Sequence, residues 1–352
     1  MSAAKRGRQN SISDDSPAAK KTAPLSTTSE PKNTTQVPVI PAKVFVVKHL
    51  IEHVSTLPED GELCSEDWDD HFGLNWCVSV ARTNNHLSVY IVEGSERWCM
   101  EGDIRIDLCG RDAKNFSVIV KFNRGHFTNY GCVDMLSWDK LAEYTIDDRL
   151  KIQIEMRISW MSKMGFNEPS KFDSSKSEVS DCILVAQDQK FHVARHFLAT
   201  HSPYFEALLL GPYKEAKMAE VQLPGLDPYD VENFLRVIYG YQAINDQNVE
   251  GLLLIADKND TPIIKERCEK YLLEESEKSI GKTFDMFLKF HCNMVGGSFP
   301  TINEKKVFQD KIMDEITTLD EYKEVINGDF ERYDLAVAKR LLMKSAELLL
   351  RG

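Results

Sequence analysis

Apolar and polar side chains alternate along the chain from residue 43 to about residue 158. The clearest run extends from Leu150 to Ile158, where every second residue is apolar and the residues between are Lys, Gln, Glu and Arg. Shorter runs of the same kind cover 104–108 and 116–122. Such alternation turns one face of a strand to a core and the other to water, as in antiparallel sheets. With turn-like segments at 83–85 and 110–112, the pattern predicts an all-β sandwich over residues 43–158.

The pattern changes after residue 180. Two short apolar stretches, 182–185 and 191–193, are typical of strands. Apolar residues then recur at i, i+3, i+4 and i+7 within 231–238 and again within 249–256, which predicts two helices. Pro262, preceded by Thr261 as N-cap, predicts the start of a third helix. Together these elements predict a mixed α+β domain over residues 178–275.

Only helical spacing follows, over residues 276–352. One apolar stripe contains Ile280, Phe284 and Phe287, and the last stripe contains leucines at heptad intervals, at 335, 342 and 349. We expect three or four short helices that form a bundle packed on the preceding domain. The alternative is a dimeric coiled coil formed by the last stripe.

Two stretches have no such pattern. Residues 1–42 contain no aromatic residue and hold five of the 13 prolines, so they are expected to form a disordered basic tail. Within the tail, basic residues at 5, 6 and 8 precede Lys20 and Lys21, which resembles a bipartite nuclear import signal; a solvated basic tail is the alternative. Residues 159–177 are rich in Ser and Lys and are expected to form a linker.

Composition narrows the class of protein. The net charge of -12 argues against a nucleic-acid partner held by phosphate contacts. No run approaches the roughly 20 apolar residues of a membrane helix, and no apolar signal core is present at the N-terminus. The eight cysteines include no CxxC pair and are expected to be reduced. We therefore expect an intracellular protein, in the cytoplasm, the nucleus or both, without membrane or nucleic-acid partners.

Candidate catalytic and metal-binding patterns are incomplete. His192 and His196 are four residues apart with His201 nearby, but a zinc-protease helix needs Glu directly after the first His, and Val193 stands there. Gly281–Thr283 resembles the end of a phosphate-binding loop but lacks the leading glycine. The acidic pairs at 69–70 and 147–148 are typical of turns and surface charge. We expect no metal, no cofactor and no enzymatic activity.

Residue identities in the second domain resemble the BTB/POZ domain. The resemblance covers about residues 178–275 and follows both the residues and the order of the elements. The residues that carry it are Ser180-Asp181-Cys182, Phe191-His192-Val193, Leu198-Ala199, Ser202-Pro203-Tyr204-Phe205 and Leu223-Pro224.

The first domain resembles the MATH (TRAF-like) sandwich. This resemblance covers about residues 44–158, and MATH followed by BTB is similar to the speckle-type POZ adaptors and their expanded group in nematodes. The implied fold is a MATH sandwich, an α+β BTB/POZ domain and a C-terminal helical extension. The residues that carry the resemblance are His71-Phe72, Asn75-Trp76, Leu87-Ser88-Val89-Tyr90, Tyr130-Gly131 and Asp147-Asp148-Arg149-Leu150.

The resemblance to BTB adaptors implies a homodimer that binds cullin-3 and brings a target to a ubiquitin ligase for proteasomal degradation. The family's cullin-contacting motif is a hydrophobic residue, any residue and Glu, which corresponds here to Tyr213, Lys214 and Glu215. The ordinary alternative is a half-exposed loop tyrosine beside a solvated charge. At the level of the whole protein, the alternative is a BTB-dimer scaffold or transcriptional co-regulator that recruits no cullin.

The resemblance to MATH domains implies a surface for an extended Ser/Thr-containing peptide of the target protein. Position by position, the implied peptide groove comprises Tyr90, Ile104, Phe122, Tyr130 and Cys132. The family pattern has phenylalanine where this chain has Ile104 and Cys132, so a different peptide is expected. The alternative is that Tyr90 and Phe122 are core residues of alternating strands.

Overall fold

A computed structural model describes residues 43–94, 98–110, 115–125, 129–163, 170–290, 313–326 and 335–351. All of them belong to one compact unit of the chain, residues 38–352. The expected basic tail and two residues of the expected turn at 110–112, Arg111 and Asp112, lie outside the described residues. Among the described residues, no helix combines the length and the apolar character needed to cross a bilayer.

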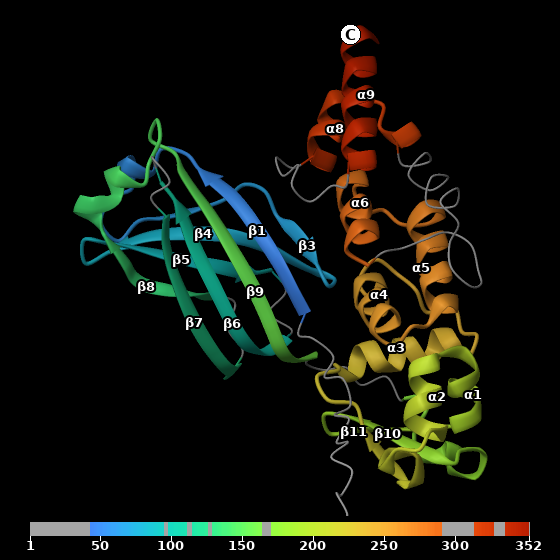
Figure 1. Ribbon diagram of the computed structural model, residues 1–352. Coiled ribbons are helices and arrows are strands. Elements are labelled where there is room, and N and C mark those ends of the chain that lie inside the picture. The colour runs from blue at the N-terminus through green and yellow to red at the C-terminus, as the bar shows by residue number, and fades with distance from the viewer. Residues whose placement is uncertain are drawn as a thin grey trace, which may run out of the picture. The chain divides into compact units, whose positions relative to one another are not determined.

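The alternating segments form two antiparallel sheets, which Figure 1 shows as facing layers. One sheet has the order β1-β9-β6-β7. The other has the order β2-β4-β5-β8, with β3 paired to β4. The strands are β1 (Lys43–Ile51), β2 (Glu62–Cys64), β3 (Asp69–His71), β4 (Leu74–Thr83), β5 (His86–Glu93), β6 (Trp98–Cys109), β7 (Asn115–Gly125), β8 (Asn129–Ser137) and β9 (Leu150–Lys163), with 3-10 turns at Val54–Thr56 and Trp138–Glu143.

The sandwich core forms where the alternation predicts it. Ile104, Ile106 and Leu108 of β6 are fully buried, as are Leu150, Ile152, Ile154 and Met156 of β9. Trp76 of the second sheet packs its ring 5.1 Å from Phe45 of the first, so both sheets contribute to one core. The predicted sandwich is confirmed.

A two-residue turn fixes the register of β4 and β5. Thr83 pairs with His86, and Asn84 and Asn85 between them have φ values of 50° and 58°. Two consecutive residues at positive φ are typical of a type I′ turn, whose twist matches that of the strands, and Asn tolerates this conformation. The turn expected at 83–85 is therefore present, and the asparagines are its physical cause.

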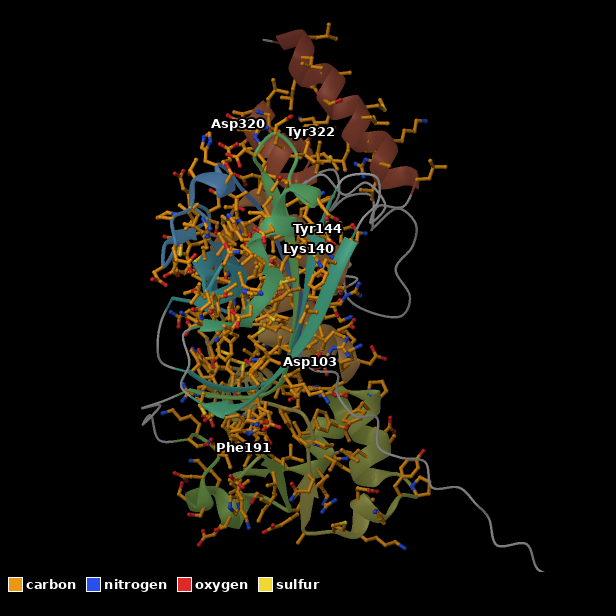
Figure 2. The ribbon with its side chains drawn as sticks, turned by 90° about the vertical axis from the view of Figure 1, so that its left-hand side faces the viewer. Asp103, Lys140, Tyr144, Phe191, Asp320 and Tyr322 are labelled. Carbon is orange, nitrogen blue, oxygen red and sulfur yellow. The ribbon has the colours of Figure 1, made fainter. Side chains whose placement is uncertain are left out.

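The second domain combines a small sheet with helices. Strands β10 (Cys182–Ala186) and β11 (Gln189–Val193) form an antiparallel hairpin, and β12 (Glu220–Gln222) pairs in parallel with β10. Phe191 of β11, labelled in Figure 2, is fully buried. The helices are α1 (Arg195–His201), α2 (Pro203–Leu210), α3 (Pro228–Ile238), α4 (Val249–Lys258) and α5 (Pro262–Glu274).

The helix predicted to begin at Pro262 is present, but Thr261 does not cap it through its side chain. The Thr261 hydroxyl donates instead to the carbonyl oxygen of Asn259, at 3.4 Å. Ser202 is a true N-cap: its hydroxyl accepts from the amide of Phe205 at 3.2 Å, and Pro203 occupies the first position of α2.

Three helices of the C-terminal region are described: α6 (Ile280–Lys289), α8 (Leu319–Ile326) and α9 (Leu335–Arg351). Figure 1 shows α8 beside α9, and Tyr322 of α8, labelled in Figure 2, is buried. The buried residues of α9 include Val337, Leu341 and Leu348. The heptad leucines at 335, 342 and 349 are exposed, so the expected apolar stripe is not the face by which this helix packs.

The segment expected as a linker contains regular structure. Strand β9 continues to Lys163, and a 3-10 helix covers Ser174–Val179. Between them, Glu232 of α3 accepts from the Ser170 hydroxyl at 2.5 Å and from the Lys171 amide at 3.0 Å. Phe172 is buried, and its carbonyl accepts from the His192 amide at 2.7 Å. Residues 170–172 are thus bound to the second domain.

Replacing Asn85 by alanine should destabilise the sandwich, because a Cβ-bearing residue without a local polar group is unfavourable at φ 58° by about 1–2 kcal/mol. Asn85→Gly should recover most of the loss. All five tryptophans precede residue 161, so urea unfolding followed by tryptophan fluorescence reports on this domain. Equal urea midpoints for the two variants would contradict the assigned turn strain.

Candidate functional site

The predicted motif at 213–215 lies on a short exposed loop of the second domain. Tyr213 directly precedes a 3-10 helix, Lys214–Lys217, and is 38% exposed. Leu210 at the end of α2 is 48% exposed, and Met218 after the loop is 44% exposed. These three side chains, with Glu215, are called the Tyr213 surface below. Three exposed apolar side chains within nine residues can anchor a protein partner.

Glu215 is less exposed than its neighbours. Its side chain is 15% exposed, whereas that of Lys214 is 85% exposed, and the two charged groups lie 3.9 Å apart. Burial, with a further contribution from the Glu215 carboxylate, raises the pKa of Tyr204 above its ordinary value. Glu215 is therefore directed toward α2 rather than into bulk water. A carboxylate held in this way can accept hydrogen bonds in a fixed direction.

Arg195 at the start of α1 holds the loop in place. Its guanidinium donates to the carbonyl oxygens of Leu209, at 3.3 Å, Ala216, at 3.1 Å, and Met218. Its backbone amide donates to the Asp181 carboxylate at 2.7 Å. One planar group thus ties together both ends of the loop, which suits the fixed fork of an arginine. The role of Arg195 leaves no signal in the pattern of side chains along the sequence, because its partners are carbonyl groups.

Three of the five residues predicted to bind a peptide lie close together. Phe122 of β7 and Tyr130 of β8 face each other, with ring centroids 4.5 Å apart. Cys132 lies two residues along β8, on the same side as Tyr130. β7 and β8 are terminal strands of the sheets that the structure describes. The structure therefore brings together Phe122, Tyr130 and Cys132 where the two sheets end.

The other two predicted residues lie elsewhere. Ile104 is fully buried and pairs with Val120 inside the sandwich, so its side chain is not accessible to a peptide. Tyr90 pairs with Gly131, whereas its neighbour Ile91 pairs with Tyr130, so Tyr90 points to the opposite face of its sheet. Ile104 is thus excluded by its burial, and Tyr90 by the alternation of side chains along β5.

The inward face of β7 is not fully covered. Phe116, Val118, Val120 and Phe122 point toward the second sheet, yet each is only half-buried. Tyr144, labelled in Figure 2, packs edge-on against Phe116 with ring centroids 6.1 Å apart. These four β7 residues and Cys132 are called the β7–β8 edge surface below. Tyr130 is only 3% exposed and packs against Phe122 as part of the core, so it is not accessible to a peptide. Half-covered apolar side chains beside a terminal strand are suited to an added strand.

The three histidines considered for metal binding are spread over two elements. His192 belongs to β11, and its ring lies 3.5 Å from the Ser180 hydroxyl. His196 and His201 belong to α1, where the His201 ring packs edge-on against Phe197. Within the part of the chain that the structure describes, no group of three or more His, Cys, Asp or Glu could hold a metal ion.

Comparison with known families agrees with both folds. Residues 51–158 match the MATH domain, and residues 171–276 match the BTB/POZ domain. The chain therefore belongs to the BTB and MATH domain-containing proteins, as the sequence indicated. Proteins with this architecture act through protein–protein interaction, and no catalytic domain is indicated.

Relatives of known name support this membership. BTB and MATH domain-containing protein 15 of Caenorhabditis elegans is 34% identical over 70% of this chain and 92% of its own length. Protein 45 of the same series is 30% identical over 71% of this chain and 56% of its own length. Kelch-like protein 40a of Danio rerio is 34% identical over 27% of this chain and 16% of its own length.

Removing the Arg195 guanidinium should loosen the loop that carries Tyr213. In Arg195→Gln, we expect amide hydrogen exchange of residues 211–218 to accelerate by about tenfold or more, because three carbonyl contacts are lost together. Lys190→Gln is the matched control, since Lys190 forms an exposed pair with Glu220 at 2.5 Å and contacts no loop carbonyl. Unchanged exchange in Arg195→Gln would show that Arg195 does not hold the loop.

Proposed function

We propose that this chain is an intracellular substrate adaptor of a cullin-3 ubiquitin ligase. The single observation that carries the proposal is the Tyr213 surface on the BTB domain of a chain that also has a MATH domain. Tyr213 supplies an aromatic anchor and Glu215 an oriented carboxylate. Aromatic residues in such positions dominate the energetics of many protein interfaces.

In this proposal, the β7–β8 edge surface binds the target. An extended peptide adds beside a terminal strand, so its main-chain groups bond to the strand and alternate side chains contact Phe122 and the other half-buried residues of β7. Thr side chains of the peptide fit such a strand because β-branched residues pack well on a pleated, half-buried surface. Ile104 and Tyr90 are left out of this contact surface because of their positions.

A homodimer formed by the BTB domain would present two MATH domains. Two linked peptide surfaces on one target raise avidity by about 10²–10⁴ when geometry permits both to bind. Each peptide contact can then remain weak and reversible. The competing function is a BTB-dimer scaffold without cullin, in which the Tyr213 surface binds another protein or none.

Binding of the N-terminal half of cullin-3 to the full chain should be measurable by calorimetry. Tyr213→Ala should weaken it by about 2 kcal/mol or more, since the side chain is an exposed anchor. Glu215→Ala should also weaken binding. Because Tyr213 is 38% exposed, the variant should unfold at nearly the same temperature as the parent chain.

Tyr241→Ala is the matched control for that experiment, because Tyr241 is a tyrosine of the same domain that is 49% exposed outside the Tyr213 surface. It should bind cullin-3 as the parent does. If the folded parent chain does not bind cullin-3, the adaptor function is wrong and the scaffold is favoured. Equal weakening by Tyr241→Ala would place the contact elsewhere.

Peptide binding can be tested separately with an array of extended Ser/Thr-rich peptides. Phe122→Ala should lower the affinity of any peptide bound by the parent about tenfold or more, because an aromatic contact is lost. Ile119→Ala is the control: Ile119 is 66% exposed on the outer face of the same strand. A peptide that loses affinity only in Ile119→Ala would show that the target binds the outer face.

A further inference from the structure

The acidic side chains of α3 and α4 are buried against the MATH domain. The Lys43 ammonium, at the first residue of β1, lies 3.3 Å from the Asp227 carboxylate and 2.6 Å from that of Asp230. The three side chains are only 9%, 4% and 7% exposed. Burial acts to lower the pKa of Lys43, but the two carboxylates outweigh it and raise that pKa above its ordinary value. Lys43 therefore stays charged where the two domains meet.

A second set of contacts surrounds the turn between β3 and β4. The Phe72 amide donates to the Glu250 carboxylate at 2.7 Å. Lys282 and Lys289 of α6 approach the same carboxylate at 3.2 Å and 3.1 Å, and its side chain is 2% exposed. Burial acts to raise the pKa of Glu250, but the two ammonium groups hold it well below its usual range.

The turn itself has an unusual backbone. Phe72 has φ 56°, a left-handed conformation that is rare for a bulky residue. Such a conformation persists only where the surrounding structure holds it in place. Gly73 has φ 73°, and a Cβ at this position would collide with the carbonyl oxygen of Gln247. The Phe72 ring is buried, with the Lys289 ammonium 4.7 Å and the Lys43 ammonium 5.4 Å from its centroid. The turn thus fits against the second domain at backbone level.

Neighbouring residues of the turn add polar contacts to α6 and the residues before it. Asp70 pairs with Lys278, and the Lys282 ammonium donates to Nδ1 of His71 at 2.9 Å. Burial, then the charge of Lys282, lowers the pKa of His71 well below its ordinary value. A neutral His71 is consistent with an Nδ1 atom that accepts a hydrogen bond. Residues 70–73 are called the docking turn below.

We propose that the docking turn and Lys43 fasten the MATH domain to α3, α4 and α6, so that the MATH and BTB domains move as one body. The physical reason is the cost of separation. Separating the domains would leave the buried carboxylates without their ammonium partners, and an unpaired buried charge is strongly unfavourable. Trp98 adds an edge-on contact to Tyr229, with centroids 5.9 Å apart.

Docking of this kind fixes where the β7–β8 edge surface points relative to the Tyr213 surface. The distance between the two surfaces is then not determined by the length of the segment that connects the domains. Residues 170–171 of that segment are themselves bound to Glu232 of α3. α6, the first helix after the BTB domain, contacts the docking turn directly. The contacts between the two domains do not depend on whether cullin-3 binds.

Lys43→Met in the full chain tests the proposal. Methionine keeps the apolar stem but leaves Asp227 and Asp230 without the ammonium. We expect amide exchange of 69–76 and of 280–289 to accelerate about tenfold or more, while β5 (86–93) keeps its protection because the sandwich remains folded. Lys151→Met, an exposed lysine on β9, is the matched control and should change neither segment.

A rescue variant separates loss of docking from loss of folding. Lys43→Met/Asp227→Asn/Asp230→Asn removes all three charges with little change in shape, and Asn can replace Asp as the N-cap of α3. Protection of 69–76 and 280–289 should return in this variant. If amide protection of 69–76 and 280–289 does not return while β5 stays protected, the three charges do not act together, and the proposal is overturned.

His71 supplies an independent readout. Its ring faces Lys278, Lys282 and Lys289, and Glu250 of α4, with Asp70 beside it on β3. In the parent chain, selectively labelled His71 should remain neutral in NMR spectra recorded at pH 6. In Lys43→Met it should titrate near its ordinary value of about 6.5. If His71 titrates normally in the parent, or if Lys43→Met leaves both exchange and titration unchanged, the domains are not docked.

Discussion

Burial of carboxylates on two neighbouring helices is the constraint from which much of this structure follows. Asp227, Asp230, Glu232 and Glu250 are each nearly inaccessible to water. A buried carboxylate without a partner costs several kcal/mol, by order of magnitude, so each one requires a cation or a hydrogen-bond donor. The donors come from Lys43, Ser170, the Lys171 and Phe72 amides and two lysines of α6. The BTB helices thereby bind segments that precede them by more than sixty residues of chain.

This constraint connects the two surfaces proposed to act in ubiquitin ligation. The Tyr213 surface is held by backbone contacts to Arg195, and the β7–β8 edge surface is part of a sandwich with its own core. Neither surface contains the buried charges. A fixed relation between them would limit which lysines of a bound target can reach the ligase. Specificity would then depend on domain orientation as well as on the peptide contacted by Phe122.

Alternation correctly predicted the buried faces of β6 and β9, and for the same reason Ile104 is part of the core. In α9, leucines at heptad intervals are exposed while Val337, Leu341 and Leu348 are buried, because 3.6 residues per turn let several apolar stripes coexist on one helix. Which stripe packs depends on the neighbouring helices. Arg195 was missed because carbonyl partners carry no residue identity.

The sequence by itself determined the class of each domain, the presence of a turn at 83–85, and the family. These follow from local periodicity and from backbone preferences that act over a few residues. Only the tertiary structure decided which of the predicted peptide-binding residues come together, and that Phe72 takes a left-handed conformation beside Glu250. Charges far apart in sequence pair only after the chain has folded back on itself. Their pairing therefore leaves no local periodicity from which it could be predicted.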